Sequence, residues 1–206
     1  MIASPSAKQF WNGGTSPYGV GHKKLGMWLF LVSDSITFGA LLISCMYARV
    51  SSPNWPTPFP AWPSIAFASL MTLCLLTSSL TMVFAVDASK RGDRGAAVRN
   101  ILWTVLGGAA FMVLHANEWL RLIAEGVSPW RNPWGAPLFG AAFFTLTGLH
   151  MVHVFTGLIY LLVVATGTRS GRRTHEDVEI CGLYWHFVDL VWMFIFPLIY
   201  LMSVSQ

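Results

Sequence analysis

Ionisable side chains lie within long apolar stretches of this 206-residue sequence, where they are costly unless they have a partner or a function. Asp34 is the clearest case. It lies ten residues after Lys24, which is about 15 Å along a helix and near the middle of a bilayer. Such a carboxylate could handle protons, lie beside an internal water, or form structural hydrogen bonds with other helices or a partner chain. We favour the structural interpretation.

A second polar group lies further along the sequence. His115 and Glu118 are three residues apart, so they share one face of a helix, and Arg121 follows them. We expect this group near the membrane interface, with Arg121 paired to Glu118. A structural role is favoured here as well.

Two further pairs have the same spacing: His150 with His153, and His186 with Asp189. Histidines on two adjacent helices could hold a b-type haem by bis-histidine ligation. The favoured alternative is an interhelical hydrogen-bond network, in which Asp189 orients one imidazole. No catalytic metal site and no nucleotide-binding or hydrolase motif is found in the sequence.

The elements that position these residues follow from composition. The chain is 54% apolar and 11% charged, whereas soluble domains carry about 25% charged residues. Five stretches reach the roughly 20 apolar residues that span a bilayer, and they cover 25–47, 62–86, 98–123, 138–166 and 178–202. The sequence therefore predicts an all-α membrane protein, a bundle of five transmembrane helices forming one domain at 25–206 behind a cytoplasmic tail at 1–24.

The basic residues indicate an orientation, because Lys and Arg concentrate in cytoplasmic loops. Ten of the 13 lie in the tail and in the second and fourth loops, and they are Lys8, Lys23, Lys24, Lys90, Arg91, Arg94, Arg99, Arg169, Arg172 and Arg173. We expect the N-terminus inside and the C-terminus outside. The net charge of +4 then reflects topology, and no nucleic-acid partner is indicated.

Three long strings carry a resemblance to a known family. They are KLGMWLFLVSDSITFGALL (24–42), FFTLTGLHMVHVFTGLIYL (143–161) and GLYWHFVDLVWMFIFPLIYL (182–201), with GDRGAAVRNILWT and HANEW between the first and the second. In this order they resemble subunit III of the haem-copper respiratory oxidases, and the resemblance covers roughly residues 23–202.

The resemblance implies a non-catalytic accessory subunit of a proton-pumping oxidase that reduces O2 to water. Such a subunit has no cofactor of its own, packs mainly on subunit I, which holds haem and copper, and also associates with subunit II. It binds phospholipid and supports proton uptake. Asp34 takes the place of the carboxylate in the family's S-E or S-D motif. Five spans instead of seven indicate the shorter bacterial form, in the plasma membrane.

Lys24 and Arg169 lie at inner helix ends, where we expect them to contact lipid phosphates. Two alternatives remain open from the sequence: a subunit III relative attached to a nitric oxide reductase, and an independent bis-histidine haem carrier. The electron donor of the complex, cytochrome c or quinol, and its membership of a respiratory supercomplex are also open.

Overall fold

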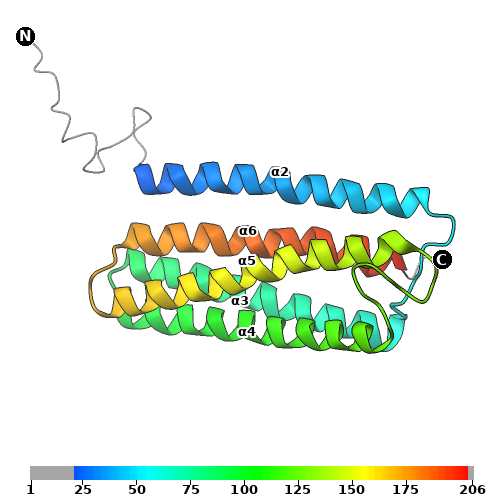
Figure 1. The fold of residues 1–206 in the computed structure, drawn as a ribbon. Coiled ribbons are helices and arrows are strands. Elements are labelled where there is room, and N and C mark those ends of the chain that lie inside the picture. The colour runs from blue at the N-terminus through cyan, green and yellow to red at the C-terminus, as the bar shows by residue number, and fades with distance from the viewer. Residues whose placement is uncertain (1–20, 204–206) are drawn as a thin grey trace, which may run out of the picture.

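The computed structural model describes residues 21–203 and shows an all-α chain (Figure 1). Five long helices make up most of this part, and they are α2 (His22–Ser51), α3 (Ala66–Lys90), α4 (Arg94–Ala124), α5 (Pro137–Arg169) and α6 (His175–Ile199). A short kinked segment (Ala61–Ile65), in which Trp62 has an extended backbone, precedes α3, and a 3₁₀ turn (Leu201–Ser203) follows α6. Each of the five long helices is long and apolar enough to span a membrane. The predicted fold class is confirmed.

Most helix ends lie beyond the apolar stretches from which the helices were predicted. The first begins at His22, so the last residues of the predicted tail are already helical, while residues 1–20 lie outside the described part. The last runs from His175 to Ile199, three residues earlier at each end than predicted. The early starts have a physical reason, because polar helix ends continue past the hydrocarbon into the headgroup region.

Local sequence signals explain where the helices start. The Asp93 side chain accepts a hydrogen bond from the Ala96 amide and caps α4, while Gly92 before it has φ +78°, a conformation that favours glycine. Thr174 and Asp177 form a reciprocal capping box at the start of α6. These signals keep the α3–α4 and α5–α6 connections short, so both pairs are antiparallel neighbours.

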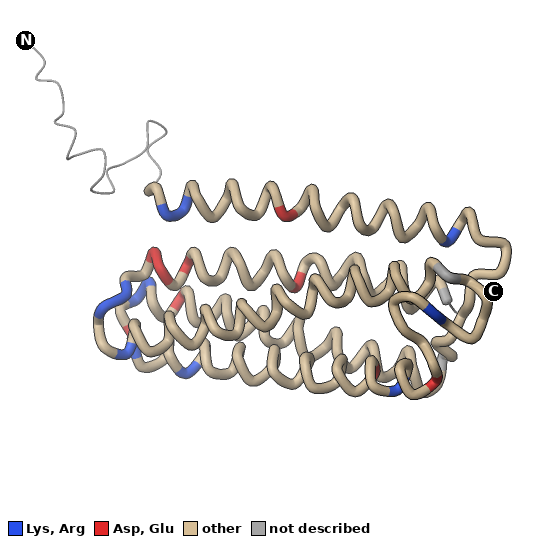
Figure 2. Tube along the Cα trace, in the orientation of Figure 1, with Lys and Arg blue, Asp and Glu red and all other residues tan. Residues whose placement is uncertain are grey.

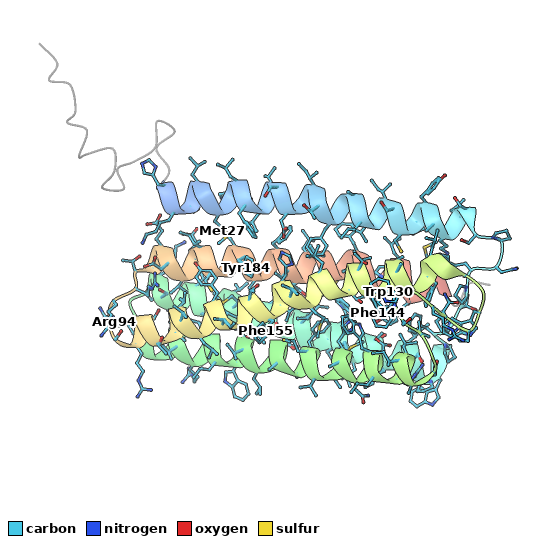
Figure 3. All side chains as sticks on the ribbon, in the orientation of Figure 1. Met27, Arg94, Trp130, Phe144, Phe155 and Tyr184 are labelled. Carbon is cyan, nitrogen blue, oxygen red and sulfur yellow. The ribbon has the colours of Figure 1, made fainter. Side chains whose placement is uncertain are left out.

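Helices α3, α4, α5 and α6 form a closed ring, and α2 lies outside it against α5 and α6 (Figure 1). Only Leu31, Phe38 and Ala48 of α2 are fully buried. Side chains such as Met27 and Tyr184 fill the space between α2 and the other helices (Figure 3). The first helix is therefore the most weakly packed of the five.

Tryptophan side chains connect the four-helix ring. Three buried or half-buried indoles donate hydrogen bonds to hydroxyl groups of the adjacent helix: Trp185 to Ser78 (3.1 Å), Trp192 to Thr72 (3.0 Å) and Trp119 to Thr147 (3.2 Å). Gly108 makes room for one of them, because a Cβ atom at that position would overlap the Trp185 ring. Such bonds compensate for the missing hydrophobic driving force between helices in lipid.

Charged residues gather at the two ends of the bundle (Figure 2). In the described part, nine Lys and Arg lie at the end where α2 begins, and Arg49, Arg121 and Arg131 lie at the other. Two carboxylates, Asp34 and Asp189, occur near the middle of their helices. These two carboxylates are among the polar groups inside the bundle.

Candidate functional site

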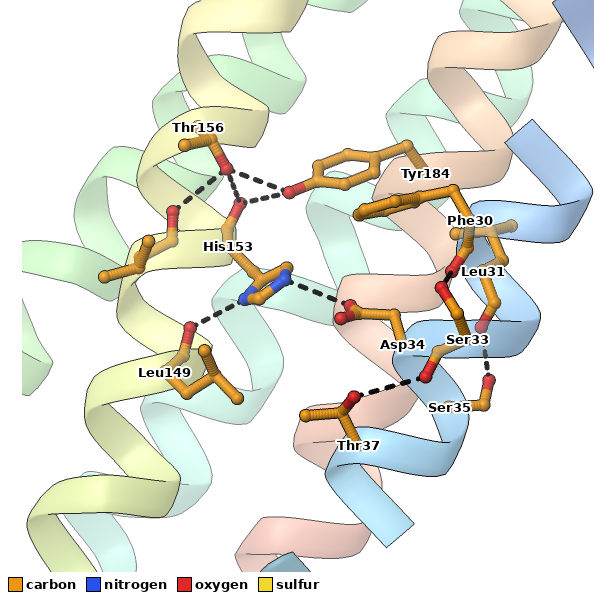
Figure 4. Close-up of polar contacts among 11 residues, drawn as sticks. Phe30, Leu31, Ser33, Asp34, Ser35, Thr37, Leu149, His153, Thr156 and Tyr184 are labelled. Carbon is orange, nitrogen blue, oxygen red and sulfur yellow. Dashed lines mark hydrogen bonds and ion pairs between the residues drawn. The ribbon is translucent and has the colours of Figure 1, made fainter. Parts of the chain in front are cut away.

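The closest interhelical contact between ionisable groups at mid-membrane joins α2 to α5. His153 Nε2 lies 3.0 Å from Asp34 Oδ2, and both side chains are mostly buried (Figure 4). The other ring nitrogen, Nδ1, is 2.8 Å from the Leu149 carbonyl oxygen. Asp34 is thus held by a histidine that the sequence placed on a different helix.

The hydrogen bond of the His153 ring shows which of its nitrogens carries a proton. A carbonyl oxygen only accepts, so Nδ1 of His153 carries a proton and donates it to Leu149. Nε2 is therefore the nitrogen that faces the Asp34 carboxyl, with 3.0 Å between Nε2 and Oδ2.

Helix α6 contributes to the same site through Tyr184. Its hydroxyl donates to the His153 carbonyl oxygen (2.9 Å) and lies 2.9 Å from the Thr156 hydroxyl (Figure 4). Its ring packs against Phe30 of α2, with 6.1 Å between centroids. Three helices therefore meet around His153, and neither Tyr184 nor Thr156 was predicted as a site residue.

His150 lies one turn before His153 and is fully buried. Its ring stacks on Trp192 with 5.4 Å between centroids. His115 of α4 is also fully buried, at 5.4 Å from Trp192 and 5.6 Å from Phe111. None of the four ring nitrogens of these two histidines has a hydrogen-bond partner among the described residues.

Glu118 continues this group toward the end of α4. Its Oε2 lies 3.8 Å from His115 Nδ1 and accepts a hydrogen bond of 2.5 Å from the Tyr200 hydroxyl. The expected ion pair with Arg121 does not form, although both side chains line the same pocket. Arg121 lies 3.3 Å from Glu125 and donates to the Ser64 hydroxyl, because its long side chain reaches toward the exposed helix end.

His186 and Asp189 lie on α6, apart from the other histidines. The Ser79 hydroxyl of α3 is 2.6 Å from His186 Nδ1 and also lies beside the Asp189 carboxyl. The prediction that Asp189 orients an imidazole directly is wrong for the residues that the structure describes. A serine hydroxyl from the adjacent helix takes that position instead.

The two residues predicted to contact lipid differ in their surroundings. Lys24 Nζ lies 2.7 Å from Glu179, and the adjacent Lys23 lies 3.0 Å from Asp177, so both tie α2 to the start of α6. Arg169 instead lines a groove of about 660 Å³ along α4, together with Arg99 and Trp103.

The histidines do not fit the alternative of a bis-histidine haem. Both nitrogens of His153 face protein atoms, His150 is enclosed by Phe111 and Trp192, and His186 faces Ser79 on another helix. Within residues 21–203, no three His, Cys, Asp or Glu side chains come together as a metal site. The groups instead connect neighbouring helices.

The family model for cytochrome c oxidase subunit III matches residues 12–204. The chain belongs to the cytochrome c oxidase subunit III family. It is 33% identical over 187 residues to a cytochrome c oxidase subunit 3 of Alkalihalophilus pseudofirmus, covering 89% of this chain and 88% of that protein. It is 32% identical over 189 residues to a cytochrome bo(3) ubiquinol oxidase subunit 3 of Pseudomonas aeruginosa, covering 89% and 86%.

The polar contacts around His153 join residues of the three strings that resemble subunit III. In this family member, the first string lies on α2, the second on α5 and the third on α6. Asp34 and His153 join the first two, and Tyr184 joins the third to the second. The three strings that carry the resemblance therefore meet at one point of the structure.

The contact between Asp34 and His153 can be measured by a double-mutant cycle on the full-length chain in bicelles. We expect Asp34→Ala and His153→Ala to be non-additive, with a coupling energy of about 1 kcal/mol in the free energy of unfolding. The reason is that either substitution alone removes the interhelical contact.

Asp34→Ala combined with His186→Ala is the matched control for that cycle. His186 bonds to Ser79 rather than to Asp34, so these two effects should add. Additive effects for Asp34 and His153 as well would contradict the proposed contact.

Proposed function

We propose that this chain is the accessory subunit III of a bacterial haem-copper terminal oxidase that reduces O2 to water and pumps protons. The supporting observation is the match over nearly the whole chain to relatives named as subunit 3 of cytochrome c and ubiquinol oxidases. In this proposal, haem and copper lie in partner subunits, and subunit I is the main contact, with subunit II also in the complex.

In this proposal, the chain itself has a structural role. Its mid-membrane polar groups connect helices to one another: Asp34 with His153, and Ser79 with His186. Exposed large apolar side chains occur on all five helices, so the bundle suits lipid or partner helices on every side. We propose that it stabilises subunit I, retains lipid and supports proton uptake.

The proposed location is the bacterial plasma membrane, with the N-terminus inside. The support is the charge distribution, since the basic end of the bundle carries three times as many Lys and Arg as the other in the described part. The relatives named above are bacterial proteins.

Lipid binding is proposed for the groove along α4. Its walls are apolar at Leu102, Trp103 and Leu106, and two guanidinium groups, Arg99 and Arg169, lie at its polar end. Neither guanidinium forms an ion pair with a described residue, whereas Lys24 is already bound to Glu179. An acyl chain against the apolar wall and a phosphate between the two arginines fit this arrangement.

The function is tested by purifying the tagged chain from its host in mild detergent and identifying the associated proteins by mass spectrometry. We expect a haem-copper catalytic subunit in stoichiometric amount, with O2 consumption and without NO consumption. A tagged, unrelated multi-pass protein of the same host serves as the control. A preparation without any haem-copper subunit would overturn the proposal, as would stoichiometric haem in the isolated chain.

The lipid site is tested with the double variant Arg99→Gln/Arg169→Gln and native mass spectrometry in the presence of phosphatidylglycerol. Each basic residue near an anionic lipid contributes about 1 kcal/mol, so binding should weaken by more than about tenfold. Arg131→Gln, at the opposite end of the bundle, should leave binding unchanged. Equal lipid retention in both variants would reject this site.

A further inference from the structure

A row of polar side chains crosses the bundle from one end of α4 to the middle of α2. It begins at Glu118, continues through His115 and His150, and ends at the pair of His153 with Asp34. Three of its members, Glu118, His115 and His150, are at most 4% exposed. The row joins three helices, α4, α5 and α2.

Consecutive members of the row lie close together. Glu118 is 3.8 Å from His115. His115 and His150 pack against the same two rings, Phe111 and Trp192, at centroid distances of 5.4 to 5.7 Å. His150 and His153 are three residues apart on α5 and so share one face of that helix. No hydrogen bond joins His115 to His150, because their ring nitrogens have no partner among the described residues.

The two central histidines need hydrogen-bond partners that the described part of the chain does not supply. A neutral imidazole has one donor and one acceptor nitrogen, so the pair presents four polar atoms. Leaving a buried donor or acceptor unpaired costs about 1–3 kcal/mol. Buried waters typically occupy such positions, each forming about three hydrogen bonds to otherwise unpaired groups.

A pocket with both polar and apolar walls opens at the Glu118 end of the row. Its volume is about 110 Å³, and its lining includes Ser64, Asn117, Glu118 and Arg121. Asn117 is exposed at its mouth, whereas Glu118 lies inside and is almost completely buried. The pocket thus reaches the carboxylate that lies next to His115.

We propose that internal water binds between His115 and His150 and connects the Glu118 pocket to the pair of Asp34 and His153. Protons of that pair then exchange with the aqueous phase through this hydrated row. Exchange passes a proton from water to imidazole or carboxylate and returns one to water, so no other reactant is needed. This inference does not depend on the proposed function.

Water contact is measured on the full-length chain in lipid bilayers, with ¹⁵N-labelled His and Trp, by water-edited solid-state NMR. We expect His115 and His150 ring nitrogens to receive magnetisation from water several-fold faster than the Trp185 indole nitrogen. Trp185 is a dry reference, because its indole is buried and bonded to Ser78. Equally slow transfer to the histidines and to Trp185 would overturn the proposal.

The entry point is tested in the same experiment with Asn117→Phe, which places a ring across the mouth of the pocket. We expect slower transfer to His115 and His150, with Trp185 unchanged. Val113→Phe is the matched control, since Val113 is exposed on the same helix and does not line the pocket. Unchanged transfer to both histidines in the Asn117 variant would reject the pocket as the route.

Discussion

Hydrocarbon offers no hydrogen-bond partner, so each polar side chain inside this bundle must find one on another helix or in bound water. The contact of Asp34 with His153 is the clearest consequence. Helix α2 lies outside the four-helix ring and buries little of its apolar surface. Its position therefore depends on polar contacts: Lys23 and Lys24 at one end, Asp34 at the middle, and Arg49 with the Met202 carbonyl at the other end.

The ring of α3 to α6 is also held by polar contacts between helices, but here the contacts join indole and hydroxyl groups. Its indole and hydroxyl bonds are individually weak, since interhelical hydrogen bonds in membrane proteins average about 0.6 kcal/mol. Close packing adds to them where Gly108 lets the Trp185 ring approach. Many small contributions hold the ring, whereas α2 depends on a few. A change at Asp34 should consequently affect the attachment of α2 more than the integrity of the ring.

The sequence was sufficient to predict the helices, because runs of apolar residues and the polar loops between them determine the spans. It also identified the carboxylate and histidine side chains that lie within the spans. It could not assign partners, since helical spacing relates residues within one helix only. Glu118 was expected to pair with Arg121 three residues away, but its partner is Tyr200, which lies 82 positions further along the chain. The Ser79 hydroxyl beside His186 and Asp189 was equally invisible, because it depends on how α3 packs against α6.

The most direct measurement of this account compares Asp34→Asn with Asp34→Ala in the purified oxidase during continuous turnover. An asparagine amide can still donate to His153 Nε2, whereas alanine leaves that nitrogen without a partner. We expect initial O2 reduction near the wild-type rate in both variants. The alanine variant should then lose activity sooner or release this chain from the complex. Immediate loss of O2 reduction in the asparagine variant would contradict a structural role for Asp34.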